Sequence, residues 1–155
     1  MQSGESLAPK IAHASEVLVE ALLNERKILT CGNGVGAAQA QILTACLLNR
    51  FEQERPSLPS FNLGADYISQ SAIAADSSPN DVYAKQIRAL GQAGDVLVLI
   101  TASGRSANLL QAVSAAHAQD IRVVALTGGD GGNTAALLDN QDIELRASLA
   151  SRTRI

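Results

Sequence analysis

The sequence is poor in aromatic residues and in charge. Only 3% of its 155 residues are aromatic, with two Phe, two Tyr and no Trp, and 17% are charged. So few rings argue against a platform on which nucleic-acid bases stack. The net charge of −3 and the scattered Lys and Arg residues lack the basic footprint of a DNA- or RNA-binding protein. We therefore expect no direct nucleic-acid binding.

Long hydrophobic runs and cysteine-rich patterns are also missing. No apolar stretch reaches the roughly 20 residues that cross a bilayer, and the first six residues, MQSGES, do not resemble a secretory signal. The two cysteines, Cys31 and Cys46, lie in apolar surroundings that are typical of free, buried thiols. These features predict a cytoplasmic protein without a membrane partner.

The sequence does contain enough apolar material for one α/β core, since 46% of its residues are hydrophobic. Short apolar runs alternate with segments of helical periodicity, which predicts right-handed βαβ crossovers and a three-layer αβα sandwich around a parallel sheet. The predicted strands are 27–31, 60–63, 95–100, 121–126 and 142–145. The predicted helices are 7–25, 37–51, 67–74, 82–90, 107–119 and 134–138.

A glycine-rich loop follows the first predicted strand. In the sequence CGNGVG, at 31–36, the glycines let backbone N–H groups approach an anion, and the next helix begins there with its positive dipole end. The spacing is G-x-G-x-G, not the G-x-G-x-x-G of dinucleotide sites, and no acidic residue ends the next strand. A nicotinamide or flavin site is therefore disfavoured.

A second loop, TASGRSAN at 101–108, follows the most apolar predicted strand. It places three hydroxyl groups, those of Thr101, Ser103 and Ser106, around a glycine at the start of a helix. Hydroxyls and free helix N–H groups at such a position form a cup for phosphate. The alternative is that Ser103 or Ser106 only caps the helix. Three hydroxyls exceed what one cap needs, so anion binding is favoured.

Other polar residues are weaker candidates. His13 and His117 lie within predicted amphipathic helices, where surface or packing roles are expected. No group of His, Cys, Asp and Glu has the sequence spacing of metal ligands, so no metal site is predicted. Asp76 and Asp81 precede the helix at 82–90 and either cap it or face a ligand. The sequence leaves that choice open.

Five segments in order resemble one known family: CGNG, NRFEQERPSLP, VYAKQIRALGQAGDVLVLI, TASGRSAN and VVALTGGDGG. They are similar to the sugar isomerase (SIS) domain family, and within it to the phosphoheptose isomerases and the DnaA initiator-associating proteins, called DiaA. The resemblance runs from about Leu22 to Ile155. It implies a single SIS domain over 1–155, a flavodoxin-like five-stranded parallel sheet, and a homotetramer with sites at subunit interfaces.

The resemblance also assigns binding residues. The positions that hold the sugar phosphate in the family, and an acidic position near the sugar, match Asn33, Gly34, Thr101, Ser103, Ser106 and Asp76.

Several positions depart from the isomerase pattern. The isomerases carry a His and, one turn later, a Glu on the crossover helix, for metal binding and proton transfer between sugar carbons. Those places hold Ile42 and Cys46, and neither suits the role. Gly36, Ala75 and Ala102 replace polar family residues, which lowers the expected phosphate affinity. We therefore predict no catalytic residue and no cofactor, with zinc expected only if the chain is an isomerase.

The family pattern also continues beyond the residues that correspond to Arg154 and Ile155, into a helix that completes the catalytic set. We therefore expect that C-terminal helix to be missing. Three functions remain. The favoured one is a non-catalytic, DiaA-like phosphosugar-binding protein that binds DnaA and regulates initiation of chromosome replication. The alternative is a phosphoheptose isomerase that converts sedoheptulose 7-phosphate to D-glycero-D-manno-heptose 7-phosphate. The third is a phosphosugar sensor without a role in replication.

Overall fold

The computed structural model describes residues 3–147, with side chains from Leu7 onward. Its centre is a five-stranded sheet in which every neighbouring pair is parallel, in the order β2-β1-β3-β4-β5. This strand order is that of the flavodoxin-like doubly wound fold. The strands are β1 (Ile28–Gly32), β2 (Ser60–Asn62), β3 (Val96–Thr101), β4 (Arg122–Gly128) and β5 (Ile143–Ala147).

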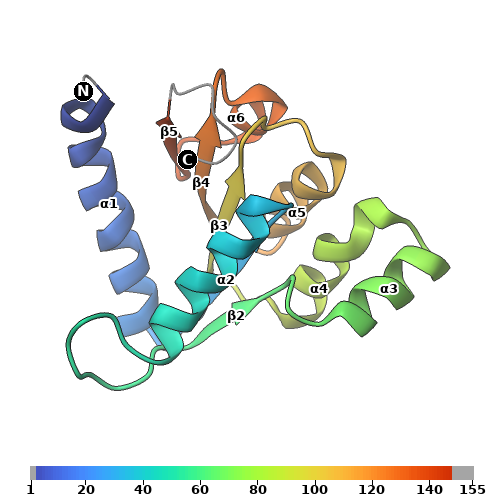
Figure 1. The fold of residues 1–155 in the computed structure, drawn as a ribbon, viewed down its shortest axis with the longest axis horizontal. Coiled ribbons are helices and arrows are strands. Elements are labelled where there is room, and N and C mark those ends of the chain that lie inside the picture. Colours follow the sequence, from blue (N-terminus) through green and yellow to red (C-terminus); the bar gives the residue numbers. More distant parts are fainter. Residues whose placement is uncertain (1–2, 148–155) are drawn as a thin grey trace.

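Helices cover both faces of this sheet. In Figure 1, α1 stands to the left of the sheet, whereas α5, α4 and α3 lie to its right. Helix α2 packs with α1 over one face, and α4 and α5 pack together over the other. The three-layer αβα sandwich is therefore confirmed. The helical segments are α1 (Ser3–Leu23), α2 (Val35–Leu48), α3 (Tyr67–Asp76), η1 (Pro79–Asp81), α4 (Val82–Leu90), α5 (Ala107–His117) and α6 (Gly132–Leu137).

The core divides into one cluster on each face of the sheet. Along β3, Leu97 and Leu99 pack against the α4 and α5 side, whereas Val96 and Val98 pack against the α1 side. All residues of β1 and β3 are buried, as in parallel strands that helices cover on both faces. The carboxyl ends of these two strands are therefore held by the best-packed part of the domain.

A buried polar network fixes α2 over β1. The Thr30 hydroxyl lies 2.7 Å from that of Thr44 and 3.2 Å from the carbonyl oxygen of Ala40, both on α2. It also accepts a hydrogen bond of 2.9 Å from the amide of Asn62 on β2. Because buried polar groups are costly unless paired, this network favours one placement of α2 and of the loop that precedes it.

The element boundaries differ from the predicted ones by a few residues. Two residues at the end of β4 have a different secondary structure from the predicted one, because Thr127 and Gly128 were expected in a loop. They continue the strand because they pair with Arg146 and Ala147 of β5. The short helix η1 was not predicted either.

Two further features concern the cysteines and the apolarity of the helices. Cys31 and Cys46 are both free thiols. No helix within residues 3–147 combines the length and apolarity that crossing a bilayer requires. Arg154 and Ile155, after which the family's C-terminal helix was expected to be missing, lie outside the described residues.

Candidate functional site

The two predicted ligand loops meet at one edge of the sheet. Strands β1 and β3 are neighbours, and their register pairs Gly32 with Ile100, so both strands end at the same level. The chain leaves β1 into α2 on one face and leaves β3 into α5 on the other. A doubly wound sheet binds its ligands in the crevice beyond such a pair of strand ends. The structure therefore brings the loop at Asn33 and Gly34 beside the loop that begins at Thr101.

The glycines of the first loop allow α2 to start close to the sheet. Gly34 precedes α2 with φ 56°, and the space around its missing side chain is open. Gly36 lies in the first turn, where a Cβ atom would come within 2.7 Å of the Ile100 carbonyl oxygen. A serine at this position would displace α2 from the end of β3. Close packing of α2 against the end of β3 therefore explains the glycine at position 36.

Asn33 joins the two loops directly. Its side chain exchanges two hydrogen bonds with that of Asn108 in the first turn of α5, at 2.8 and 2.9 Å. Asn33 remains exposed, so a ligand in the crevice can reach it. This contact spans 75 residues of sequence and holds the start of α5 at the end of β1.

Tyr83, on α4, forms a hydrogen bond to the start of the first loop. Its hydroxyl donates to the carbonyl oxygen of Gly32 at 2.5 Å and lies 3.4 Å from Oδ1 of Asn33. Burial, with a smaller effect of the Cys31 thiol, raises the pKa of Tyr83 to about 12, so the phenol stays protonated and remains a donor. Sequence reasoning missed Tyr83. The available signal was a tyrosine in a helix expected to be packed, because a buried hydroxyl needs a partner.

The second loop leaves a helix terminus uncapped. Ser106 occupies the N-cap position of α5, yet its hydroxyl caps no backbone N–H group. The first N–H groups of the helix, at Ala107 and Asn108, have no acceptor within the helix itself. Thr101 is buried, and its hydroxyl accepts from the Gly104 N–H at 3.0 Å, which closes the loop. The alternative that Ser106 only caps the helix therefore does not describe this structure.

A charged pair borders the same loop. Arg105 donates to the Ser103 carbonyl oxygen at 3.0 Å and to the Asp130 carboxylate at 2.6 Å. The hydrogen bond from Arg105, and then one from the Gly132 N–H, hold the pKa of Asp130 below its usual value. The hydroxyl of Ser103 is exposed beside this pair. The sequence did not single out Asp130, which is 25 residues away from Arg105.

The loop after β4 is locked onto the loop after β3. The carbonyl oxygen of Gly104 accepts from both the N–H, at 2.8 Å, and the hydroxyl, at 3.1 Å, of Thr134. Gly104 has φ +64°, and any Cβ there would collide with the Gly131 carbonyl oxygen. The shape of the hydroxyl-rich loop is therefore imposed by its neighbour.

Asp76 is not brought to these loops by direct contact. It is the exposed last residue of α3, and within residues 3–147 no hydrogen bond or ion pair joins its side chain to either loop. Helix α3 packs against η1 and α4, and both of these pack against α5. Asp81 stands at the N-cap position of α4 without capping it, and its carboxylate instead accepts from the Ser77 hydroxyl at 3.1 Å. A ligand role for Asp76 stays a prediction.

The two positions that replace the isomerase pair lie one turn apart on α2. The Ile42 side chain is 64% exposed, and Cys46 is half-buried. The resemblance expects an imidazole and a carboxylate at these two positions, which here carry an alkyl group and a thiol.

Comparisons with known proteins agree with this architecture. Residues 2–128 match the model of the SIS domain family. The chain is 50% identical over 153 residues to the phosphoheptose isomerase of Chromohalobacter salexigens, covering 99% of this chain and 78% of the relative. It is 52% identical over 144 residues to the DnaA initiator-associating protein DiaA of Yersinia enterocolitica, covering 93% and 74%. The solved phosphoheptose isomerase of Francisella tularensis superposes with a TM-score of 0.91 at 43% identity, over 94% of this chain and 76% of that one. This chain therefore belongs to the SIS domain family.

Proposed function

We propose that this chain is a phosphosugar-binding SIS protein without isomerase activity, which associates with the initiator DnaA as its DiaA relatives are named for doing. The observation that carries the proposal is the contrast between the loop after β3 and helix α2. The loop after β3 offers an uncapped helix end and the Ser106 hydroxyl, which caps no backbone N–H group, whereas α2 carries Ile42 and Cys46.

The phosphate would bind at the start of α5. The N–H groups of Ala107 and Asn108 and the hydroxyl of Ser106 supply donors, and the helix dipole favours an anion there. Asn33 would add a donor from the opposite loop, because its amide is already held at this edge by Asn108. Thr101 is buried and would shape the loop through its bond to Gly104.

Turnover would need a base that moves a proton between two sugar carbons. An isoleucine has no group that accepts a proton or binds a metal ion, and a thiol is a poor substitute for a carboxylate base. Zinc at this position would therefore lack its two ligands on α2. These substitutions support a binding protein over an isomerase.

The isomerase remains the second candidate because a specific observation favours it. The Chromohalobacter salexigens relative at 50% identity is called phosphoheptose isomerase, and its identity to this chain is close to that of the DiaA relative. On that alternative, the substrate is sedoheptulose 7-phosphate and zinc is the cofactor.

A homotetramer also belongs to the proposal. Helix α2 is rich in apolar residues, and Val35, Ile42 and Leu48 are exposed on it. Phe51, just beyond the helix, is exposed as well. Contact with another copy of this chain would cover these side chains.

Calorimetric titration with sedoheptulose 7-phosphate tests the binding step. We expect binding, and we expect Ser106→Ala to weaken it about tenfold because one phosphate donor is lost. Ser114→Ala is the matched control, because Ser114 is an exposed serine on the same helix whose hydroxyl bonds only to the Leu110 carbonyl oxygen. Equal effects of the two substitutions would contradict binding at the loop.

Two further measurements separate the candidate roles. Sugar isomerisation is assayed with and without added zinc, and we expect no turnover in either case. Retention of purified DnaA on the immobilised protein is expected at micromolar concentration. Turnover would establish the isomerase instead, and binding of the phosphosugar without retention of DnaA would leave a sensor with no role in replication.

A further inference from the structure

A cleft of about 440 Å³ lies at the opposite edge of the sheet from the phosphate loops. It opens at the amino ends of β3 and β4, between the end of α1, the end of α5 and the turn before β5. Four acidic and two arginine side chains line it, and Arg122 is already paired with Glu20 at 3.3 Å. The second arginine, Arg26, donates to the Ala93 carbonyl oxygen. The cleft therefore has an excess of negative charge.

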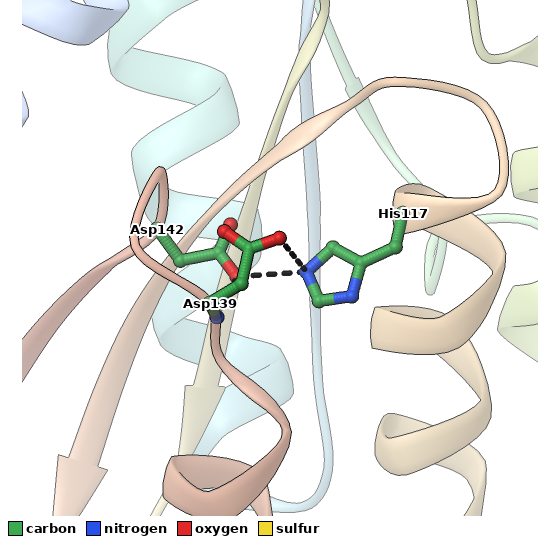
Figure 2. Close-up of side chains that lie close together, drawn as sticks. All are labelled: His117, Asp139 and Asp142. Atoms are coloured by element: carbon green, nitrogen blue, oxygen red, sulfur yellow. Dashed lines mark hydrogen bonds and ion pairs between the residues drawn. The ribbon is translucent and has the colours of Figure 1, made fainter.

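One corner of this cleft contains three potential metal ligands. Figure 2 shows the ring of His117, at the end of α5, pointing toward the carboxylates of Asp139 and Asp142 in the turn before β5. The Nε2 atom of His117 lies 2.7 Å from Oδ2 of Asp142 and 4.0 Å from Oδ2 of Asp139. The three ligand atoms all lie within 4.8 Å of one another. We call these three residues the His-Asp-Asp corner.

The spacing of the corner suits a tetrahedral metal ion. Ligands at about 2.0–2.1 Å from such an ion are roughly 3.3 Å apart. The two measured distances from Nε2, 2.7 and 4.0 Å, lie on either side of that value. Small shifts of the His117 and Asp139 side chains would therefore complete the geometry without moving a strand.

Asp142 is oriented before any ion arrives. Its side chain is only 1% exposed, and its two oxygens accept hydrogen bonds from the backbone N–H groups of Val123, at 2.8 Å, and Asp139, at 2.9 Å. Such bonds fix a carboxylate ligand and supply the outer contacts that metal sites require. His117 ends α5, where the helix dipole also favours a cation.

We propose that the His-Asp-Asp corner binds a divalent cation, with Zn²⁺ as the preferred ion. One imidazole nitrogen and two carboxylate oxygens are ligands that zinc accepts, and water from the cleft supplies the fourth. The bound form would be the neutral imidazole with its proton on Nδ1, so that Nε2 donates its lone pair to the metal, and any proton displaced from Nε2 would pass to the solvent. The ion replaces the hydrogen bond between His117 and Asp142.

The ion would tie the end of α5 to the turn that leads into β5. These segments are separated by 22 and 25 residues in sequence, which is why ligand spacing along the chain did not reveal the site. Binding to the folded state alone stabilises it, so the unfolding temperature rises with zinc concentration. The proposal stands independently of the proposed function, because the corner and the phosphate loops lie at opposite ends of α5.

The presence of only two histidines makes the test direct. The untagged chain of residues 1–155 is treated with chelator, exchanged into buffer and titrated with zinc chloride, while the imidazole resonances are followed by NMR. We expect one equivalent to bind and the signals of His117 alone to shift. His117→Gln should weaken binding on the order of a hundredfold, and Asp139→Asn about tenfold.

His13→Gln provides the matched control. His13 also faces a carboxylate, that of Glu16 at 3.6 Å, but it is exposed and belongs to no comparable cluster in the described residues. Unchanged zinc affinity in His117→Gln, or a shift of the His13 signals instead, would overturn the proposal. Asp142 is left intact because its backbone hydrogen bonds make it a structural residue. A rise in unfolding temperature with zinc in the parent, smaller in Asp139→Asn at the same zinc concentration, provides a readout separate from sugar binding.

Discussion

The side chains of Asn33 and Asn108 are paired through two hydrogen bonds across the crevice between β1 and α5. Each amide uses one N–H group and its oxygen in this pair, which leaves one N–H group on each residue free for a ligand. The pair is thus both a clamp between two loops and a source of two oriented donors.

Replacing Asn108 with alanine should affect the ligand more than the fold. We expect phosphosugar affinity to fall about tenfold, because Asn33 loses the partner that orients it. The free energy of unfolding should fall by no more than about 1 kcal/mol, since the pair is exposed to water. Calorimetric titration and urea unfolding measure the two effects. Asn140→Ala, at an exposed turn, is the control, and an equal loss of affinity there would contradict the clamp.

The contact between Gly104 and Gly131 predicts a large loss of stability on adding one methyl group. Gly104→Ala combines a positive φ with a collision against the Gly131 backbone, and we expect a cost of about 4 kcal/mol in the free energy of unfolding. Gly129→Ala also has a positive φ, but the space there is open, so about 1 kcal/mol is expected. Urea unfolding of both variants provides the comparison. Similar losses would show that backbone strain alone matters.

The raised pKa of Tyr83 predicts a loss of stability at high pH. An unfolded tyrosine has a pKa near 10, whereas burial raises that of Tyr83 to about 12. The folded state therefore holds its proton longer. The resulting stabilisation is complete below pH 10 and disappears as the pH rises toward 12, by about 2–3 kcal/mol in total.

The two tyrosines and the absence of tryptophan make this measurable by ultraviolet titration. In the Tyr67→Phe variant Tyr83 is the one remaining tyrosine, and its ionisation midpoint in the folded protein should lie near 12. Tyr83→Phe should reduce the alkaline loss of stability, whereas Tyr67→Phe should leave it unchanged. A midpoint near 10 for Tyr83 in the folded protein would contradict the assignment.

A charge on the exposed face of α2 should disrupt self-association. We expect Ile42→Lys to shift the protein from tetramer to smaller species in light scattering, because an interface core rejects an unpaired ammonium group. Leu90→Lys makes the same kind of change at the end of α4, on the other side of the sheet, and should leave the tetramer intact. A parent protein that is already monomeric would disprove the tetramer.

Most of the fold could be predicted because its signals are local. The continuous apolar runs of β1 and β3 and the periodicity of α4 identify elements without knowledge of their neighbours. The end of β4 could not be predicted in this way. Whether Thr127 and Gly128 extend the strand depends on β5, which provides their pairing partner.

The residues of the candidate site also separate into those with a local sequence signal and those without one. Asn33, Thr101 and Ser106 could be proposed from the sequence because glycine-rich and hydroxyl-rich loops after apolar strands are local patterns. Tyr83 and Asp130 were missed because their roles arise from contacts across 51 and 25 residues. The His-Asp-Asp corner was not predicted from the sequence for the same reason. Spacing along the sequence does not predict that a histidine at the end of one helix lies close to two aspartates in a distant turn.

The interlocked backbones of the loops after β3 and β4 limit how ligand selectivity can be redesigned. Gly104 and Gly131 leave no room between the loops for a side chain, and Thr134 occupies the polar contact that remains. Mutational libraries that vary the glycines would consist mainly of misfolded variants. Diversity directed at Ser103 and Arg105, whose side chains are exposed at the rim, would sample new ligands while the scaffold beneath them is preserved.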